Sequence, residues 1–282
     1  MSTSSSGSPT AEPYFAELCS AVAVVAERLG VPFFLVGATA RDLILSGQNR
    51  SGDWRRTKDV DLGVRVQSWA EYGTLRQGLI DTGRFAPDRT VHRLLFGSAL
   101  VDLVPFGGVA DVDGQIEWSA DPDARLSVLG FEEAYRTADT LQVGSDPAVI
   151  LRVASPTGLV ILKFLAWADR RGFATKDAYD LRLLIRNYLG SSNEDRLFSE
   201  HPDIVHVADF DYEVAGAKLL GRDIVQQASP EALAAIRDVL GREVQDSALA
   251  AAATRESGDT ESMANYLSAI REELGRAPQS YS

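Results

Sequence analysis

The chain has 282 residues, of which 45% are hydrophobic and 24% are charged. This composition predicts a globular protein with enough apolar residues for one large domain or two modest ones. The formal net charge is −12. Such a charge argues against tight nonspecific binding of nucleic acid over the whole surface.

Neither a disulfide scaffold nor a membrane protein is indicated. The single cysteine, Cys19, cannot form an internal disulfide and is expected to pack in the core. The opening MSTSSSGSPT lacks the basic and apolar stretches of a signal peptide, and no apolar run approaches the ~18 residues of a membrane span. We expect a cytoplasmic protein with no membrane partner and a disordered tail at residues 1–12.

The first half of the chain alternates between helical and strand patterns. Helical periodicity predicts helices at 14–29, 38–46 and 68–81. Short apolar or alternating runs predict strands at 33–36, 58–66, 90–96 and 99–105. The last two strands are separated by Gly97-Ser98, which favours a hairpin. More strands are expected between residues 115 and 154.

From residue 155 onward the patterns are helical, with predicted helices at 156–171, 176–189, 211–221, 230–242 and 260–274. The pairs Ser155-Pro156 and Ser229-Pro230 place a proline at the first helical position. We therefore predict an α+β protein with two domains. A mixed β-sheet flanked by helices occupies 13–153, and a helical domain occupies 154–282, with a weakly ordered stretch near 244–262.

Two acids at alternate positions stand in the strand predicted at 58–66. Because side chains alternate along a strand, Asp59 and Asp61 point from one face, opposite Val60, Leu62 and Val64. Two like charges there are costly unless a cation lies between them. Mg²⁺ typically takes one or two carboxylates plus substrate phosphates. The pair therefore indicates metal-assisted nucleotidyl transfer, and the plainer alternative is a half-exposed edge strand.

A turn of small residues precedes these acids. Gly37 and Ala38 end the predicted strand at 33–36 and open a helix, so the backbone can approach a phosphate and offer free N–H groups. Thr39 adds a hydroxyl donor. Glycine is also common in such turns for steric reasons alone.

A third acid, Asp102, lies within the apolar strand predicted at 99–105. An acid in such a strand is costly unless it is paired or bound to a metal. If this strand lies beside that of Asp59, the three carboxylates converge and could hold two metal ions with a triphosphate. Asp102 would then be a ligand, a general base or both. The alternative is a hydrogen bond to a neighbouring loop.

Lys163 is the one charged residue in the otherwise apolar segment 156–168. We expect its ammonium group either to face inward beside phosphate oxygens, or to reach solvent while its aliphatic stem covers apolar surface. Asp177 and Asp180 share a face of the next predicted helix, where either one could hold Lys163 or a nucleotide. Acids in a first helical turn also complement the helix dipole. Two basic clusters are present, formed by Arg50, Arg55, Arg56 and Lys58 and by Arg170, Arg171 and Lys176.

These pieces, over roughly residues 33–190, resemble the DNA polymerase β-type nucleotidyltransferase superfamily. Its pattern is a Gly-Ser or Gly-Gly turn opening a helix, then Asp-x-Asp on the next strand, then a third acid on a later strand. Gly37-Ala38, Asp59 with Asp61, and Asp102 match it in order. Two departures are the Gly-Ala turn, where Thr39 can substitute for the missing hydroxyl, and the long Arg-rich loop 47–57.

Within the superfamily, the chain is most similar to the AbiEii-like toxin group, which includes the MenT enzymes. That group carries a lysine in a helical half, followed by Lys/Arg-Asp-x-x-Asp-Leu, which Lys163 and 176–181 match. The string VGATARDL at 36–43 also resembles the head of CCA-adding enzymes and poly(A) polymerases, although the helical part does not.

The resemblance implies that 13–153 is a nucleotidyltransferase domain that uses Mg²⁺ or Mn²⁺ to transfer an NMP from an NTP to an acceptor. The implied metal ligands are Asp59, Asp61 and Asp102, and the implied catalytic set adds Lys163. The implied nucleotide contacts are Gly37, Ala38, Thr39, Lys163, Asp177 and Asp180. A toxin of a toxin–antitoxin or phage-defence system is expected, with tRNA as acceptor and a cognate antitoxin as partner.

Two other functions stay open. The same chemistry could act on a small molecule, as in antibiotic modification, or on a protein, and the net charge fits these acceptors at least as well as tRNA. The chain could also be a non-catalytic nucleotide-binding regulator with the same fold, for which the Gly-Ala turn is the main support.

Overall fold

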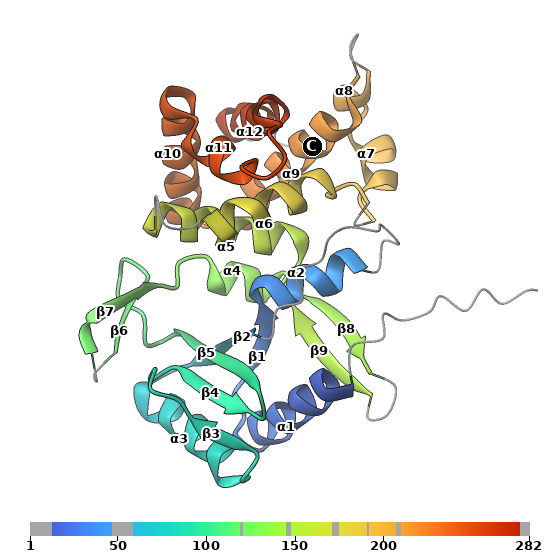
Figure 1. Cartoon of the computed structure of the whole chain (residues 1–282). Coiled ribbons are helices and arrows are strands. Elements are labelled where there is room, and N and C mark those ends of the chain that lie inside the picture. Colours follow the sequence, from blue (N-terminus) through green and yellow to red (C-terminus); the bar gives the residue numbers. More distant parts are fainter. Residues whose placement is uncertain are drawn as a thin grey trace, which may run out of the picture. The chain divides into compact units, whose positions relative to one another are not determined.

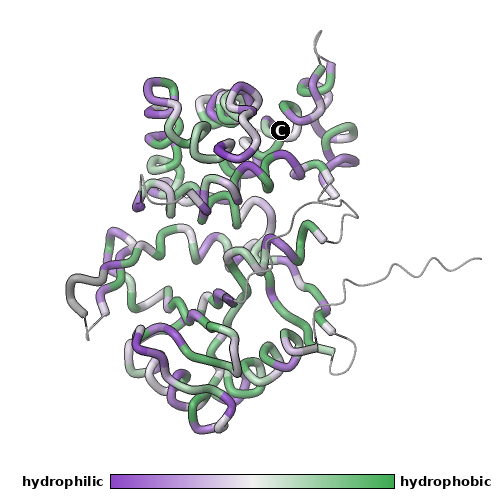
Figure 2. Tube along the Cα trace, in the orientation of Figure 1, coloured by the Kyte–Doolittle hydropathy of each residue, from purple (hydrophilic) through white to green (hydrophobic). Residues whose placement is uncertain are grey.

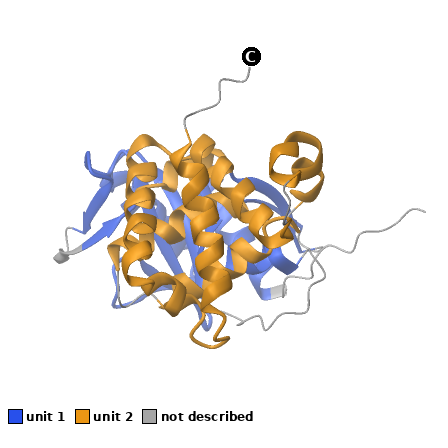
Figure 3. Cartoon of the chain, turned by 90° about the horizontal axis from the view of Figure 1, so that it is seen from above, with its two compact units in different colours: residues 1–128, 138–154 blue, residues 129–137, 155–282 orange. Residues whose placement is uncertain are grey.

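The structure is a computed structural model that describes residues 13–46, 59–118, 121–144, 148–170, 175–190, 192–206 and 210–276. The predicted tail at 1–12 and the basic residues of 47–58 lie outside this part of the chain. Figure 3 colours the two compact units into which the chain divides, 1–128 with 138–154 (unit 1) and 129–137 with 155–282 (unit 2). No described helix has the length and apolar character to cross a membrane.

Unit 1 is built on a mixed sheet, as predicted. Within the described residues, seven strands pair in the order β3-β4-β5-β2-β1-β9-β8 (Figure 1). The strands are β1 (Phe33–Val36), β2 (Asp59–Val66), β3 (Phe85–Pro87), β4 (Arg93–Phe96), β5 (Ala99–Gly107), β8 (Asp139–Val143) and β9 (Val149–Val153). The β1–β9 and β2–β5 pairs are parallel and the others are antiparallel.

Three helices accompany this sheet: α1 (Pro13–Leu29), α2 (Gly37–Ser46) and α3 (Trp69–Asp81). Helices α1 and α3 contact each other and pack on β9 and β2, and α2 begins directly at the end of β1 (Figure 1). Ser68 caps α3, because its side chain accepts a hydrogen bond from the Glu71 N–H. Cys19 is buried in α1, as predicted.

The core of unit 1 depends on close contact between β1 and β2. Phe34 is fully buried and its ring meets that of Phe106 edge to face, with centroids 5.6 Å apart. Gly63 faces Phe34 across the sheet, and a methyl group at Gly63 would lie 2.9 Å from Cδ1 of that ring. Glycine is therefore required at this point of β2 for Phe34 to fill the core.

A separate hairpin of β6 (Gln115–Trp118) and β7 (Asp121–Ser127) also belongs to unit 1. Trp118 of this hairpin is buried in an aromatic cluster, with ring centroids 5.2 Å from Trp69, 5.7 Å from Tyr72 and 5.2 Å from His92. The Tyr72 hydroxyl donates a hydrogen bond to the Leu103 carbonyl at 3.1 Å. The cluster thus secures the hairpin and α3 beside β5.

Unit 2 is helical. Its described helices are α4 (Phe131–Arg136), α5 (Pro156–Asp169), α6 (Thr175–Arg186), α7 (Glu194–Glu200), α8 (Pro202–Val205), α9 (Tyr212–Gln227), α10 (Pro230–Asp246), α11 (Ala248–Ala253) and α12 (Thr260–Gly275). Ser155 and Ser229 cap α5 and α10, each with proline in the first turn, as their sequences predict. Apolar stretches run through the helices of this unit and the strands of unit 1 (Figure 2).

A buried polar network joins four segments of unit 2. The Tyr188 hydroxyl donates a hydrogen bond to the Asp223 carboxylate. The Thr157 and Tyr188 hydroxyls are hydrogen-bonded at 2.8 Å, and Arg196 forms an ion pair with Asp223 at 2.8 Å. Burial, together with the neighbouring Asp223 charge, raises the pKa of Tyr188 well above its usual value. Tyr188 therefore stays protonated and keeps its donor role.

Several elements differ from the sequence-based prediction. A helix, α4, stands in the range where only strands were expected, and the short α7 and α8 were not predicted. The stretch 244–262, for which weak order was predicted, instead holds the end of α10 and all of α11. Leu249 and Ala250 of α11 are buried, and their N–H groups donate to the Glu243 carboxylate at 2.8 and 2.7 Å. Glu243 thus caps α11, a partner that composition alone does not indicate.

Candidate active site

The three predicted acids share one face of the unit 1 sheet. Strands β2 and β5 run in parallel, and their register pairs Asp61 directly with Asp102 and Asp59 with Leu100. Register partners in neighbouring strands point to the same side of a sheet, as do residues two apart in one strand. All three acids are half-buried, whereas Val60, Leu62 and Val64 on the other face are buried. The alternation predicted for β2 is therefore present.

The β1–α2 turn meets this acid face at Asp61. Val36 is the register partner of Asp61, and Gly37 follows it with a φ of +71°, in the left-handed region. A methyl group at Gly37 would lie 2.8 Å from the Asp61 Cγ and still closer to its Oδ2. Gly37 is thus required both by its own backbone and by the Asp61 carboxylate beside it.

Thr39 has a different partner from the predicted phosphate. Its hydroxyl donates a hydrogen bond to the Asp59 carbonyl at 2.8 Å, which ties the first turn of α2 to the start of β2. Ala38 is half-buried in the same turn. Thr39 therefore positions the turn relative to the acids, and its contact with a nucleotide stays a prediction.

Asp102 has a partner that the sequence reasoning missed. Arg93 of β4 is its register partner and binds it with both arms, Nε to Oδ1 at 2.6 Å and Nη2 to Oδ2 at 2.8 Å. The hydrogen bond to Asp102 raises the pKa of Arg93, and the Asp102, Asp59 and Asp88 charges add to the rise. Because the hairpin turns over two residues, Gly97 and Ser98, position 93 must pair with position 102. The hairpin predicted from the sequence therefore already indicated that Arg93 lies beside Asp102.

The arrangement of the three acids bears on the predicted metal site. Among the residues that the structure describes, no three acidic, histidine or cysteine side chains converge as they would around a bound metal ion. Both Asp102 oxygens contact Arg93. Mg²⁺ commonly takes one or two carboxylates when substrate phosphates provide its other ligands, so a role of Asp59 and Asp61 as metal ligands stays a prediction. Ligation by Asp102 requires the Arg93 pair to open.

The other predicted residues form a second charged cluster, within unit 2. The Lys163 ammonium of α5 lies 2.8 Å from Asp177 Oδ1 and 2.6 Å from Asp180 Oδ2, both on α6. These three side chains are 13%, 9% and 6% exposed. The exposed Arg170 also approaches Asp177, at 3.1 Å. Lys163 therefore faces inward, and its described partners are the two carboxylates that were considered for it.

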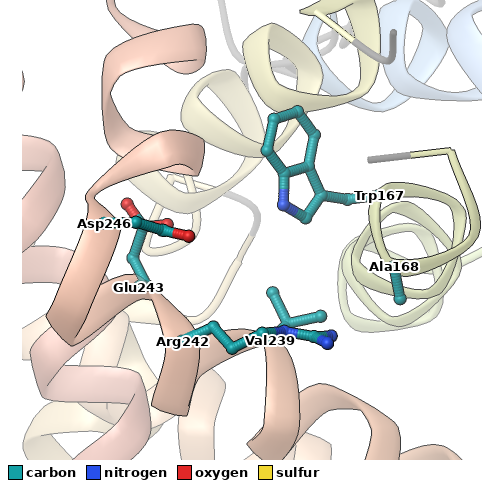
Figure 4. A pocket seen from close by; sticks show the side chains of 6 residues that line it. All are labelled: Trp167, Ala168, Val239, Arg242, Glu243 and Asp246. Carbon is teal, nitrogen blue, oxygen red and sulfur yellow. The ribbon is translucent and has the colours of Figure 1, made fainter. Parts of the chain in front are cut away.

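A shallow hollow on unit 2 involves none of these residues. It is lined by Trp167, Ala168, Val239, Arg242, Glu243 and Asp246 (Figure 4). The Glu243 oxygens there already accept the N–H groups of α11. The predicted chemistry therefore depends on the acid face and not on this hollow.

Distant likenesses to solved structures accompany this geometry. A solution structure of the antibiotic-resistance factor ANT(2'')-Ia matches 68% of this chain and 95% of its own, at 16% identity and a TM-score of 0.36. An antigenic nucleotidyltransferase-like protein from Paracoccidioides brasiliensis matches 70% and 92%, at 17% identity and 0.39. The Thermotoga maritima CCA-adding enzyme in complex with tRNA matches 94% and 82%, at 13% identity and 0.26. No family model and no curated protein matches the sequence.

Proposed function

We propose that the chain is a magnesium-dependent nucleotidyltransferase of the DNA polymerase β type, which transfers an NMP from an NTP to an acceptor hydroxyl. One observation carries this proposal: Asp61 is paired in register with Asp102, shares its face with Asp59, and contacts the Gly37 turn. Three acids beside a helix N-terminus suit a nucleotide with its metal, because the acids attract the cation and the helix attracts the phosphates.

Each residue has a task in this proposal. The first N–H groups of α2 bind the triphosphate, and Gly37 lets its oxygens come close. Asp59 and Asp61 would hold the magnesium ion, with Asp102 as a further ligand once its pair with Arg93 opens. Bound magnesium would lower the pKa of the attacking hydroxyl and offset the charge of the leaving group. Asp102 accepts the hydroxyl proton as the acceptor oxygen bonds to the α-phosphorus. The bond from that phosphorus to the bridging oxygen of pyrophosphate breaks.

For the acceptor we propose tRNA, and for the biological role a toxin of the AbiEii-like or MenT-like kind with a cognate antitoxin. The Arg-rich segment 47–58 and the basic residues around Arg170 and Lys176 support an RNA acceptor, since phosphate binding needs local positive charge. The net charge of −12 restricts such binding to these patches. Lys163, Asp177 and Asp180 are proposed to contact the nucleotide as a unit, because their opposite charges already hold them together.

A second candidate is a non-catalytic nucleotide-binding regulator. The Arg93–Asp102 pair favours it, since this pair occupies the carboxylate that would serve as general base. A small-molecule or protein acceptor is a variant of the first candidate, and the acidic surface favours that variant.

Incubation with α-labelled NTPs and magnesium tests both candidate functions and the choice of acceptor. Total RNA, total protein and a small-molecule extract are offered separately, and both label transfer and pyrophosphate release are measured. We expect labelled RNA. Asp61→Asn should lower transfer by more than ~100-fold, and Asp113→Asn, which changes an exposed acid of unit 1, should not. Nucleotide binding without pyrophosphate release in any fraction would support the regulator instead.

A further inference from the structure

Arg93 completes a row of residues across four strands. The register aligns Arg93 of β4 with Asp102 of β5, Asp102 with Asp61 of β2, and Asp61 with Val36 of β1. The Gly37 turn follows at the end of this row. Neighbouring strands are about 4.8 Å apart, so the Arg93 guanidinium lies within a side-chain length of the face where a triphosphate would bind.

The Arg93 backbone is fixed, and its guanidinium lies nearer to solvent than its partner. The neighbouring His92 is held by its carbonyl, which accepts the Leu103 N–H at 2.8 Å, and by its ring contact with Trp118. The Arg93 side chain is 28% exposed, against 14% for Asp102. The guanidinium can therefore turn toward a ligand from solvent while the strand stays in place.

A carboxylate and a phosphate are interchangeable partners for this group. Arginine presents two parallel N–H donors that match the oxygens of either anion, so both hydrogen bonds survive an exchange from one to the other. A triphosphate carries more negative charge than one carboxylate. It competes with Asp102 for the Arg93 guanidinium, and every hydrogen bond that it takes releases an oxygen of Asp102.

We propose that Arg93 is a positioning residue that holds Asp102 away from the cation in the nucleotide-free protein and passes to the triphosphate when NTP binds. This inference rests on the proposed function and adds an order of events to it. Nucleotide binding then makes Asp102 available beside Asp61. Metal affinity and nucleotide affinity are thereby linked through one guanidinium.

Metal and nucleotide binding to the whole protein test this exchange without any measurement of turnover. Mn²⁺ binding without nucleotide is followed by electron paramagnetic resonance, and binding of α,β-methylene ATP by calorimetry. Both are measured in wild type, Arg93→Gln, Arg89→Gln and Asp61→Asn. Arg89→Gln removes the same charge from an exposed position in the loop that precedes β4. We expect Arg93→Gln to bind Mn²⁺ about tenfold more tightly and the analogue about tenfold more weakly. Arg89→Gln should match wild type.

The outcomes separate the two proposals. Should Mn²⁺ binding depend on Asp61 but be no tighter in Arg93→Gln, the role of Arg93 is wrong and the nucleotidyltransferase proposal stands. Absence of Mn²⁺ binding from every variant, with and without analogue, overturns both. If Arg93→Gln does not fold by circular dichroism, Arg93→Lys replaces it. A lysine holds the carboxylate at one point only, so a smaller gain in Mn²⁺ affinity is expected, and no gain contradicts the inference.

Discussion

The Asp61 carboxylate lies against Gly37, so closely that a methyl group on Gly37 would be 2.8 Å from the Asp61 Cγ. This contact fixes the first acid pair relative to the N-terminus of α2. Any side chain at position 37 must displace either the turn or the acid.

Gly37→Ala should therefore abolish metal binding and transfer. Gly30 offers a matched control, because it has a φ of +68° but open space around a Cβ. Both alanines carry backbone strain of about 1–2 kcal/mol, and only Gly37→Ala also moves Asp61. Unfolding in denaturant and Mn²⁺ binding are measured for both variants. Equal Mn²⁺ affinity in the two would contradict a role for the Gly37–Asp61 contact.

Lys163→Met should destabilise unit 2 by about 3–5 kcal/mol, since it leaves two buried carboxylates of α6 without their shared cation. Lys218→Met is the control. It breaks a pair with Glu272 that is more exposed, and should cost less than about 1 kcal/mol. Denaturant unfolding gives both values. A comparable loss of unfolding free energy in the two variants would show that the Lys163 cluster stabilises the protein no more than an exposed ion pair does.

Lys163→Met also tests nucleotide contact when it is assayed below its unfolding temperature. Steady-state kinetics should then show weakened NTP use if the cluster binds nucleotide, as predicted. NTP kinetics like those of wild type would leave Lys163 a purely structural ion-pair partner.

Gly63→Ala should cost about 1–3 kcal/mol, because its methyl group would enter the space of the buried Phe34 ring. Gly73→Ala, in the middle of α3 with open space around it, should instead stabilise the protein by about 1 kcal/mol. Thermal and denaturant unfolding of both variants check the opposite signs. A stable Gly63→Ala protein would mean that Phe34 repacks easily.

Stability should fall as the pH drops below about 6.5. Burial lowers the pKa of His201, and the adjacent Arg222, whose Nη1 lies 2.9 Å from the His201 Nδ1, lowers it further. Between the lowered folded-state pKa and the ordinary unfolded value, the unfolded chain holds the extra proton, so stability is lost as pH falls. The free energies of unfolding at pH 7.5 and 5.5 should differ less in His201→Gln than in wild type. An identical pH dependence would assign the effect elsewhere.

The sequence was most informative where structure is local. The strand at Phe33–Val36, the turn at Gly97-Ser98 and the helix starts after Ser155 and Ser229 depend on neighbours in the chain, and all were predicted. The three-residue β3 exists only because β4 pairs with it, and α11 requires the Glu243 carboxylate from another helix. Such partners lie outside any local pattern.

The candidate site likewise combines features that follow from the local sequence with features that depend on distant parts of the chain. The alternation of Asp59 and Asp61 follows from strand geometry, but their meeting with Asp102 depended on strand order, which only the sheet reveals. The sequence predicts Thr39 at the phosphate because its hydroxyl can replace the one that the Gly-Ala turn lacks, whereas its bond to the Asp59 carbonyl does not follow from spacing. The pairing of Arg93 with Asp102 follows from counting residues along the predicted hairpin, yet Arg93 is not among the predicted site residues.

The order of strands also has a consequence for how the chain folds. The β4–β5 hairpin closes over two residues, whereas the register partners Asp61 of β2 and Asp102 of β5 are 41 residues apart in the chain. Short loops close earlier and at lower entropic cost than long ones. We expect Asp102 to acquire its guanidinium partner before it approaches Asp61. The hairpin then brings to β2 a carboxylate whose charge Arg93 already balances, which lowers the electrostatic cost of placing Asp102 beside Asp61.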